Sequence, residues 1–145
     1  RRVLRPRVLV YGAVLVLITA AVGVSIAMRS PFKVDIVRDR STLARLVDDG
    51  WVENVYRLQV MNRTESPQTY RLAVSGLEGL VLAAPDVTVA PAGIESLVVS
   101  LRLPYEAAQP LRGRSVPVVF ELAMQPQAAG PPTVRSGPST FFVPR

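Results

Sequence analysis

Cysteine and histidine are both missing from this sequence of 145 residues, which narrows the chemistry that the chain can perform. Without cysteine no disulfide can form, and without either residue the chain offers no thiolate or imidazole ligand to a metal ion. The sequence also has no phosphate-binding loop, dinucleotide fingerprint or nucleophile elbow. We therefore expect no catalytic residue, no bound cofactor and no metal site within this chain.

Basic residues outnumber acidic ones and give a net charge of +6, but the excess is confined to one end. Six of the 17 basic residues lie within residues 1–33, which contain no acidic residue. The rest of the chain has eleven basic residues against all 11 acidic ones and is formally neutral. Because a nucleic-acid-binding domain needs a positive field over its folded surface, we expect no nucleic-acid partner.

Residues 8–28 form a run of 21 residues without a charge. At a rise of about 1.5 Å per residue, a helix of this length spans roughly 30 Å, the thickness of a bilayer's hydrocarbon core. The run predicts a transmembrane helix in a lipid bilayer. Four arginines within residues 1–7 favour a cytoplasmic N-terminal flank, with the rest of the chain on the other side of the membrane.

Two other interpretations of this run remain open. It could be a buried helix of a soluble protein, or a cleaved signal peptide with Ser25-Ile26-Ala27 imitating the cleavage site. The chain begins at Arg1 rather than methionine, from which we expect a fragment of a longer polypeptide.

After the apolar run, the periodicity of apolar residues changes to two, which is typical of strands that are buried on one face. Strands are predicted over 33–38, 52–62, 70–74, 80–83, 87–89, 96–103, 116–124 and 139–143. Turn signals separate these short strands, and no strong amphipathic helix interrupts them. The predicted fold class is all-β, an immunoglobulin-like antiparallel β-sandwich preceded by a single transmembrane α-helix.

The predicted domain organisation has four parts. Residues 1–7 are the basic flank, 8–28 the helix, 29–50 a juxtamembrane linker with the first strand, and 51–145 the sandwich, which also takes in 34–38. Asp48-Asp49-Gly50 predicts a turn.

Trp51, Tyr56 and Tyr70 are predicted to be core or cross-strand aromatics. Asn62-Arg63-Thr64 matches a glycosylation sequon, a triplet that is common by chance.

A dense cluster of charges, Asp35, Arg38, Asp39 and Arg40, follows the predicted helix. These residues are candidates for a salt-bridged collar that docks the domain on the membrane or on a partner. The alternative is a solvated linker whose local ion pairs contribute little stability. Asn54, in the stretch Glu-Asn-Val-Tyr, is a further candidate interaction residue.

Several stretches together resemble the C-terminal part of the FixG/CcoG family, the accessory proteins of cbb3-type cytochrome c oxidase. They are Arg5-Pro-Arg-Val-Leu-Val-Tyr-Gly12, Pro31-Phe-Lys-Val-Asp-Ile-Val-Arg-Asp-Arg40, Val52-Glu-Asn-Val-Tyr-Arg-Leu-Gln-Val-Met-Asn62, Tyr70-Arg-Leu, Gly76-Leu-Glu-Gly and Thr140-Phe-Phe-Val-Pro144. The resemblance covers nearly the whole chain but only the tail of the family's architecture.

The resemblance implies a longer parent protein in a bacterial inner membrane, with further membrane helices and a ferredoxin-like domain that carries cysteine-bound [4Fe–4S] clusters. It also implies that the β domain after the helix is periplasmic. The family is linked to oxidase assembly, with a proposed role in reducing copper. No cluster ligand can be carried over to this chain, because it has no cysteine. The predicted function is therefore docking to an oxidase subunit or a copper-delivery protein. Two alternatives remain: a tail that stabilises a metal-reducing enzyme, and an unrelated membrane-anchored β-sandwich that binds a partner.

Overall fold

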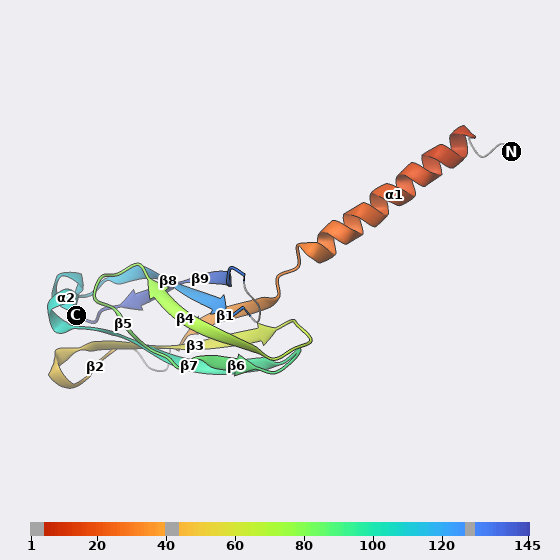
Figure 1. Ribbon diagram of the computed structural model, residues 1–145. Coiled ribbons are helices and arrows are strands. Elements are labelled where there is room, and N and C mark those ends of the chain that lie inside the picture. The colour runs from red at the N-terminus through yellow and green to blue at the C-terminus, as the bar shows by residue number, and fades with distance from the viewer. Residues whose placement is uncertain (1–4, 40–43, 127–129) are drawn as a thin grey trace. The chain divides into compact units, whose positions relative to one another are not determined.

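The computed structural model describes residues 5–39, 44–126 and 130–145 (Figure 1). The chain divides into two compact units, of which the first ends at Ser30 and the second comprises Pro31–Arg145. The first unit contains one long helix, and the second contains all the strands of the described chain.

Helix α1 comprises Pro6–Ala27 and is apolar on all sides. Pro6 lies in the first turn, where its missing N–H removes no helical hydrogen bond. Within its own unit, none of the residues of α1 is buried. By length and composition α1 is able to cross a membrane, in agreement with the helix predicted over 8–28.

The first sheet has five strands in the order β1-β3-β7-β5, with β2 paired to the beginning of β3. Its strands are β1 (Phe32–Arg38), β2 (Arg45–Leu46), β3 (Val52–Asn62), β5 (Val81–Ala83) and β7 (Ile94–Leu103). All pairings in this sheet are antiparallel. Alternation along β3 buries Tyr56, Leu58 and Val60 and exposes Arg57 and Gln59, as the sequence pattern predicts.

The second sheet has four antiparallel strands in the order β6-β4-β8-β9. Its strands are β4 (Gln68–Ser75), β6 (Val87–Val89), β8 (Ser115–Met124) and β9 (Thr133–Phe142). Short helical segments lie in the connections: η1 (Asp48–Gly50), α2 (Tyr105–Ala108) and η2 (Gln109–Leu111). The two sheets pack face to face, so the predicted all-β sandwich with a preceding apolar helix is confirmed (Figure 1).

Aromatic pairs join the two sheets in the core. The ring centroids of Tyr56 and Phe120 are 5.0 Å apart, and those of Phe32 and Tyr70 are 4.9 Å apart. All four side chains are at most 1% exposed. Such tilted or edge-on pairs stabilise by about 0.5–1.5 kcal/mol beyond the burial of their area. The prediction that Tyr56 and Tyr70 are core aromatics is confirmed.

Side chains of the first sheet cover the free edge of β9, the last strand of the second sheet. Asn54 donates from Nδ2 to the carbonyl oxygen of Phe142 at 2.8 Å and accepts the Phe142 N–H through Oδ1 at 3.2 Å. The Tyr56 hydroxyl donates to the carbonyl oxygen of Thr140 at 2.8 Å, and Arg38 donates to the Thr140 hydroxyl at 3.3 Å. The unpaired N–H and C=O groups of an edge strand can form hydrogen bonds with a strand of another chain. Here side chains satisfy these edge groups instead.

The last strand and the first strands differ in extent from the sequence-based expectation. β9 begins at Thr133, whereas the sequence predicts a strand from residue 139. The prediction misses the first residues of β9 because Gly137 and Pro138 interrupt the alternation of apolar and polar residues. An edge strand tolerates such residues, since its outer N–H groups need no ladder partner. Residues 31–50 belong to the β unit, in which β1 and β2 both pair with β3.

Candidate functional site

Three charged side chains lie side by side on the outer face of the first sheet, one each from β2, β3 and β7. The register places Arg45 opposite Glu53 and Glu53 opposite Arg102. Arg45 donates to one Glu53 carboxylate oxygen at 2.8 Å, and the Arg102 Nε donates to the other at 3.1 Å. Glu53 is only 3% exposed although it points outward from β3. Two guanidinium groups thus share one carboxylate, and this charged triad keeps a net positive charge.

The arginines also determine the ionisation of Glu53. Burial alone would raise the pKa of Glu53, but the hydrogen bonds and positive charges of Arg45 and Arg102 outweigh it and hold the pKa below its usual value. Glu53 therefore stays ionised at neutral pH and lacks the raised pKa that a carboxyl group needs to act as a general acid or base near neutral pH. Its role in this arrangement is to hold two arginines at fixed positions on the sheet.

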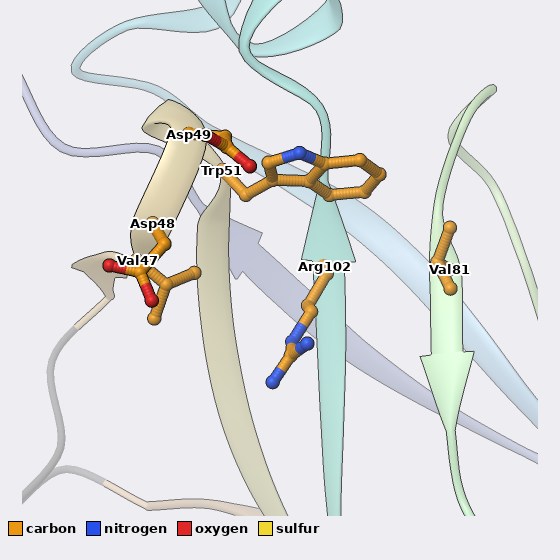
Figure 2. A pocket seen from close by; sticks show the side chains of 6 residues that line it. All are labelled: Val47, Asp48, Asp49, Trp51, Val81 and Arg102. Carbon is orange, nitrogen blue, oxygen red and sulfur yellow. The ribbon is translucent and has the colours of Figure 1, made fainter.

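A cleft of about 380 Å³ opens beside this triad (Figure 2). Its lining residues are Val47, Asp48, Asp49, Trp51, Val81 and Arg102. In Figure 2 the indole of Trp51 lies above the Arg102 side chain, and Val81 faces the cleft from β5. The volume is within the range of small-ligand sites, and it also suffices for a large side chain of a partner protein.

The turn before β3 forms one wall of the cleft. Asp49 and Gly50 both have positive φ values, 65° and 76°, which glycine adopts freely and aspartate adopts more readily than most residues. The Val47 N–H donates to the Trp51 carbonyl oxygen at 2.9 Å and closes the turn. The structure agrees with the turn that Asp48-Asp49-Gly50 predicts.

The cleft is lined by both apolar and charged side chains. Its lining combines three apolar side chains, Val47, Trp51 and Val81, with the charged groups of two aspartates and one arginine. Within residues 5–39, 44–126 and 130–145, no group of three histidine, cysteine, aspartate or glutamate residues is placed to hold a metal ion. A ligand in the cleft would contact these apolar and charged side chains.

The predicted charged collar does not form a single cluster in the described residues. Asp35 lies on the outer face of β1 and pairs with Lys33 at 3.1 Å, with both side chains more than half exposed. Arg38 points to the other side of β1, toward β9. Asp39 continues the pairing with β3 through its backbone N–H. Arg40 lies outside the described residues.

The two asparagines that the sequence singles out are both buried. Asn54 is 2% exposed and bonds to Phe142 as described above. Asn62 is 1% exposed, and its Nδ2 donates to the carbonyl oxygen of Ser66 at 2.8 Å and to two carbonyls at the end of β6. Its Oδ1 accepts both the N–H and the hydroxyl of Thr64. The triplet at Asn62 is therefore a buried link between the β3–β4 and β6–β7 turns, and the amide is not free to carry a sugar.

Sequence reasoning missed the triad and misplaced Trp51. Glu53 stands at an outward position of β3, where alternation alone indicates exposure, and Arg102 lies 49 residues away in the sequence. The only signal available was the unusual Glu-Asn pair at the start of an apolar strand. Trp51, which is predicted to be a core or cross-strand aromatic, is not in the core: it is partly exposed and lines the cleft, because its side chain points outward from the sheet like that of Glu53.

Comparison with known proteins found one matching family and several similar solved structures. Residues 22–144 match the family described as "IG-like fold at C-terminal of FixG, putative oxidoreductase". The crystal structure of a FixG-related protein from Vibrio parahaemolyticus is 25% identical, with a TM-score of 0.67 over 81% of this chain and 99% of that chain. The GAE domain of yeast GGA1 is 12% identical, with a TM-score of 0.45 over 79% of this chain and 94% of that chain. No curated protein matches the chain.

Proposed function

Because this chain belongs to the FixG family, in which it represents the immunoglobulin-like C-terminal domain, we propose that it is the membrane-anchored interaction module of a longer protein. In this proposal α1 spans a bacterial inner membrane, the N-terminal flank is cytoplasmic and the β-sandwich is periplasmic. The exposed apolar surface of α1 supports the anchor, since such a helix needs a lipid or protein environment.

The module would act by docking, with the outer face of the first sheet as its binding surface. The single observation that carries this proposal is that the sandwich of this chain has a cleft of about 380 Å³ with apolar walls and an arginine held by Glu53. Arginine and tryptophan at a partly enclosed site are the residue types that dominate binding energy at protein interfaces. The proposed partner is a subunit of cbb3-type cytochrome c oxidase or a copper-delivery protein.

Any redox chemistry would belong to upstream parts of the parent protein. A [4Fe–4S] cluster is held by cysteine thiolates, and this chain has none, so its residues do not fit such a cluster. We therefore assign the module a binding role and leave copper reduction, with copper as the substrate, to the proposed parent.

Removal of residues 31–145 from the parent protein, expressed in its own membranes, tests the docking role. We expect oxidase activity in the membranes to fall while the iron content of the truncated protein stays at the level of the full-length protein. Normal oxidase activity after truncation would refute the proposal.

The same experiment separates docking from the alternative of a stabilising tail. If the domain only stabilises the parent, its removal lowers iron content and protein level together. The intact mass and iron content of the native protein, purified through a tag after Arg145, provide the reference. A native protein without iron would contradict the proposal that the parent protein carries [4Fe–4S] clusters.

A further inference from the structure

Exposed apolar side chains are distributed unequally over the two faces of the sandwich. Seven large apolar residues of the described β unit are exposed, and four of them point outward from the first sheet: Val37, Val81, Ile94 and Val98. Only Val134 belongs to the second sheet. The outer face of the second sheet instead carries polar pairs, such as the Thr69–Thr88 hydrogen bond at 3.0 Å.

Two of these valines flank an arginine in the centre of the first sheet. The register aligns Val37 of β1, Arg57 of β3 and Val98 of β7 in one row across adjacent strands. Val37 is 59% exposed and Val98 is 60% exposed. Since neighbouring strands are about 4.8 Å apart, the two valines lie roughly 10 Å from each other with Arg57 between them. We call Val37, Arg57 and Val98 the Arg57 row.

Arg57 differs from the other basic residues on the outer faces of the two sheets. Lys33 pairs with Asp35, Arg71 pairs with Asp86, and the two arginines of the charged triad share Glu53. Across the part of the chain that the structure describes, Arg57 has neither a hydrogen bond nor an ion pair from its side chain. Asp48 and Asp49 of the cleft are too far away to pair with Arg57, because Arg57 lies six positions after Trp51, about 20 Å along the strand.

The charge at the centre of this face favours a negatively charged partner. Arg57 carries a positive charge that no described acidic side chain pairs with, whereas the charged triad lies beside Asp48 and Asp49 of the cleft and adds no excess there. A carboxylate placed over Arg57 gains a charge-assisted hydrogen bond, which becomes stronger once the flanking valines are covered and water is excluded. Arginine is also one of the residue types enriched at interface centres, and the two valines provide apolar area that excludes water around it.

We propose that the Arg57 row is the centre of the docking surface, and that it binds a protein partner whose aspartate or glutamate pairs with Arg57 while apolar side chains cover Val37 and Val98. This inference rests on the proposed docking function and specifies the face and the chemistry of the partner.

Site-specific photo-crosslinking in the full-length, membrane-bound protein tests it. A photoreactive amino acid replaces Val98 on the first sheet or, as a control, Thr88 on the outer face of the second sheet. Each version is combined with Arg57→Glu, or with Arg71→Glu as the matched charge reversal on the opposite face. Limited proteolysis of the membranes verifies that each variant remains folded.

We expect a discrete adduct from position 98 and none from position 88. Arg57→Glu should reduce the adduct at least about tenfold, as for an interface hot spot, whereas Arg71→Glu should leave it unchanged. The crosslinked segment of the partner should contain an aspartate or glutamate whose replacement by arginine restores the adduct with Arg57→Glu.

Three results would overturn the inference. An adduct from position 88 but not from 98 would show that the domain docks through the second sheet, which keeps the docking function but contradicts the proposed surface. An adduct between two copies of this chain, or with lipid, would replace the proposed occupant. An adduct from position 98 that survives Arg57→Glu would show that the arginine does not recognise the partner.

Discussion

Two buried tyrosines give a direct test of what holds the sandwich closed. Tyr56 and Tyr70 are both 0% exposed, and both rings pack against a phenylalanine of the core. They differ in the hydroxyl group. Tyr56 donates to the Thr140 carbonyl at 2.8 Å, whereas the Tyr70 hydroxyl has no hydrogen-bond partner among the described residues. Replacement by phenylalanine removes only the hydroxyl from each and leaves the ring in place.

The expected changes in stability have opposite signs. Tyr56→Phe loses a net hydrogen bond of about 1 kcal/mol and leaves the Thr140 carbonyl without its donor, so the free energy of unfolding should fall by about 1–2 kcal/mol. Tyr70→Phe removes a buried hydroxyl that costs free energy without a partner, so stability should stay the same or rise by up to about 1 kcal/mol.

The measurement is thermal or urea unfolding of residues 31–145. The FixG-related protein of known structure is matched over 99% of its chain, which supports the use of the domain by itself. At roughly 4 °C per kcal/mol for a domain of this size, the two variants should differ in Tm by about 5–10 °C. Equal destabilisation by both substitutions would refute the reasoning, because it would mean that the Tyr56 hydrogen bond contributes nothing specific.

Two further substitutions test the buried polar residues. Glu53→Gln should lower the free energy of unfolding at pH 7 by about 1–3 kcal/mol, less than for a fully buried ion pair because both arginines are half exposed. Since the pKa of Glu53 is lower in the folded than in the unfolded state, its contribution is present above about pH 4.3 and is lost as the pH falls through the folded value. Tm measured from pH 7 to pH 3 should therefore fall less steeply in Glu53→Gln than in the unsubstituted domain, and parallel curves would contradict this assignment. Asn62→Ala should destabilise by about 2–4 kcal/mol, because three carbonyls and two donors of the neighbouring turns lose their partner; a loss below about 0.5 kcal/mol in urea unfolding would show that water replaces the amide.

The local pattern of the sequence was sufficient for most elements of the fold. Alternation of side chains along 52–62 predicts both the bounds of β3 and its buried face, because neighbouring side chains of a strand must point to opposite sides. The uncharged run over 8–28 likewise predicts α1, since helix length and hydropathy are local properties. The beginning of β9 escaped prediction, because its glycine and proline are acceptable only at the edge of a sheet, and edge position is not a local property.

The sequence by itself therefore determined most of the strands, the apolar helix and the family of this protein, whereas the tertiary structure decided which residues lie together. Asn54 and Phe142 are 88 residues apart in the sequence but exchange two hydrogen bonds. Glu53 is buried only because antiparallel pairing brings Arg45 and Arg102 to its two sides. Arg57 stands between two exposed valines for the same reason. Strand register is set by packing between distant segments, so the charged triad, the cleft and the Arg57 row emerge only after the sheet has formed.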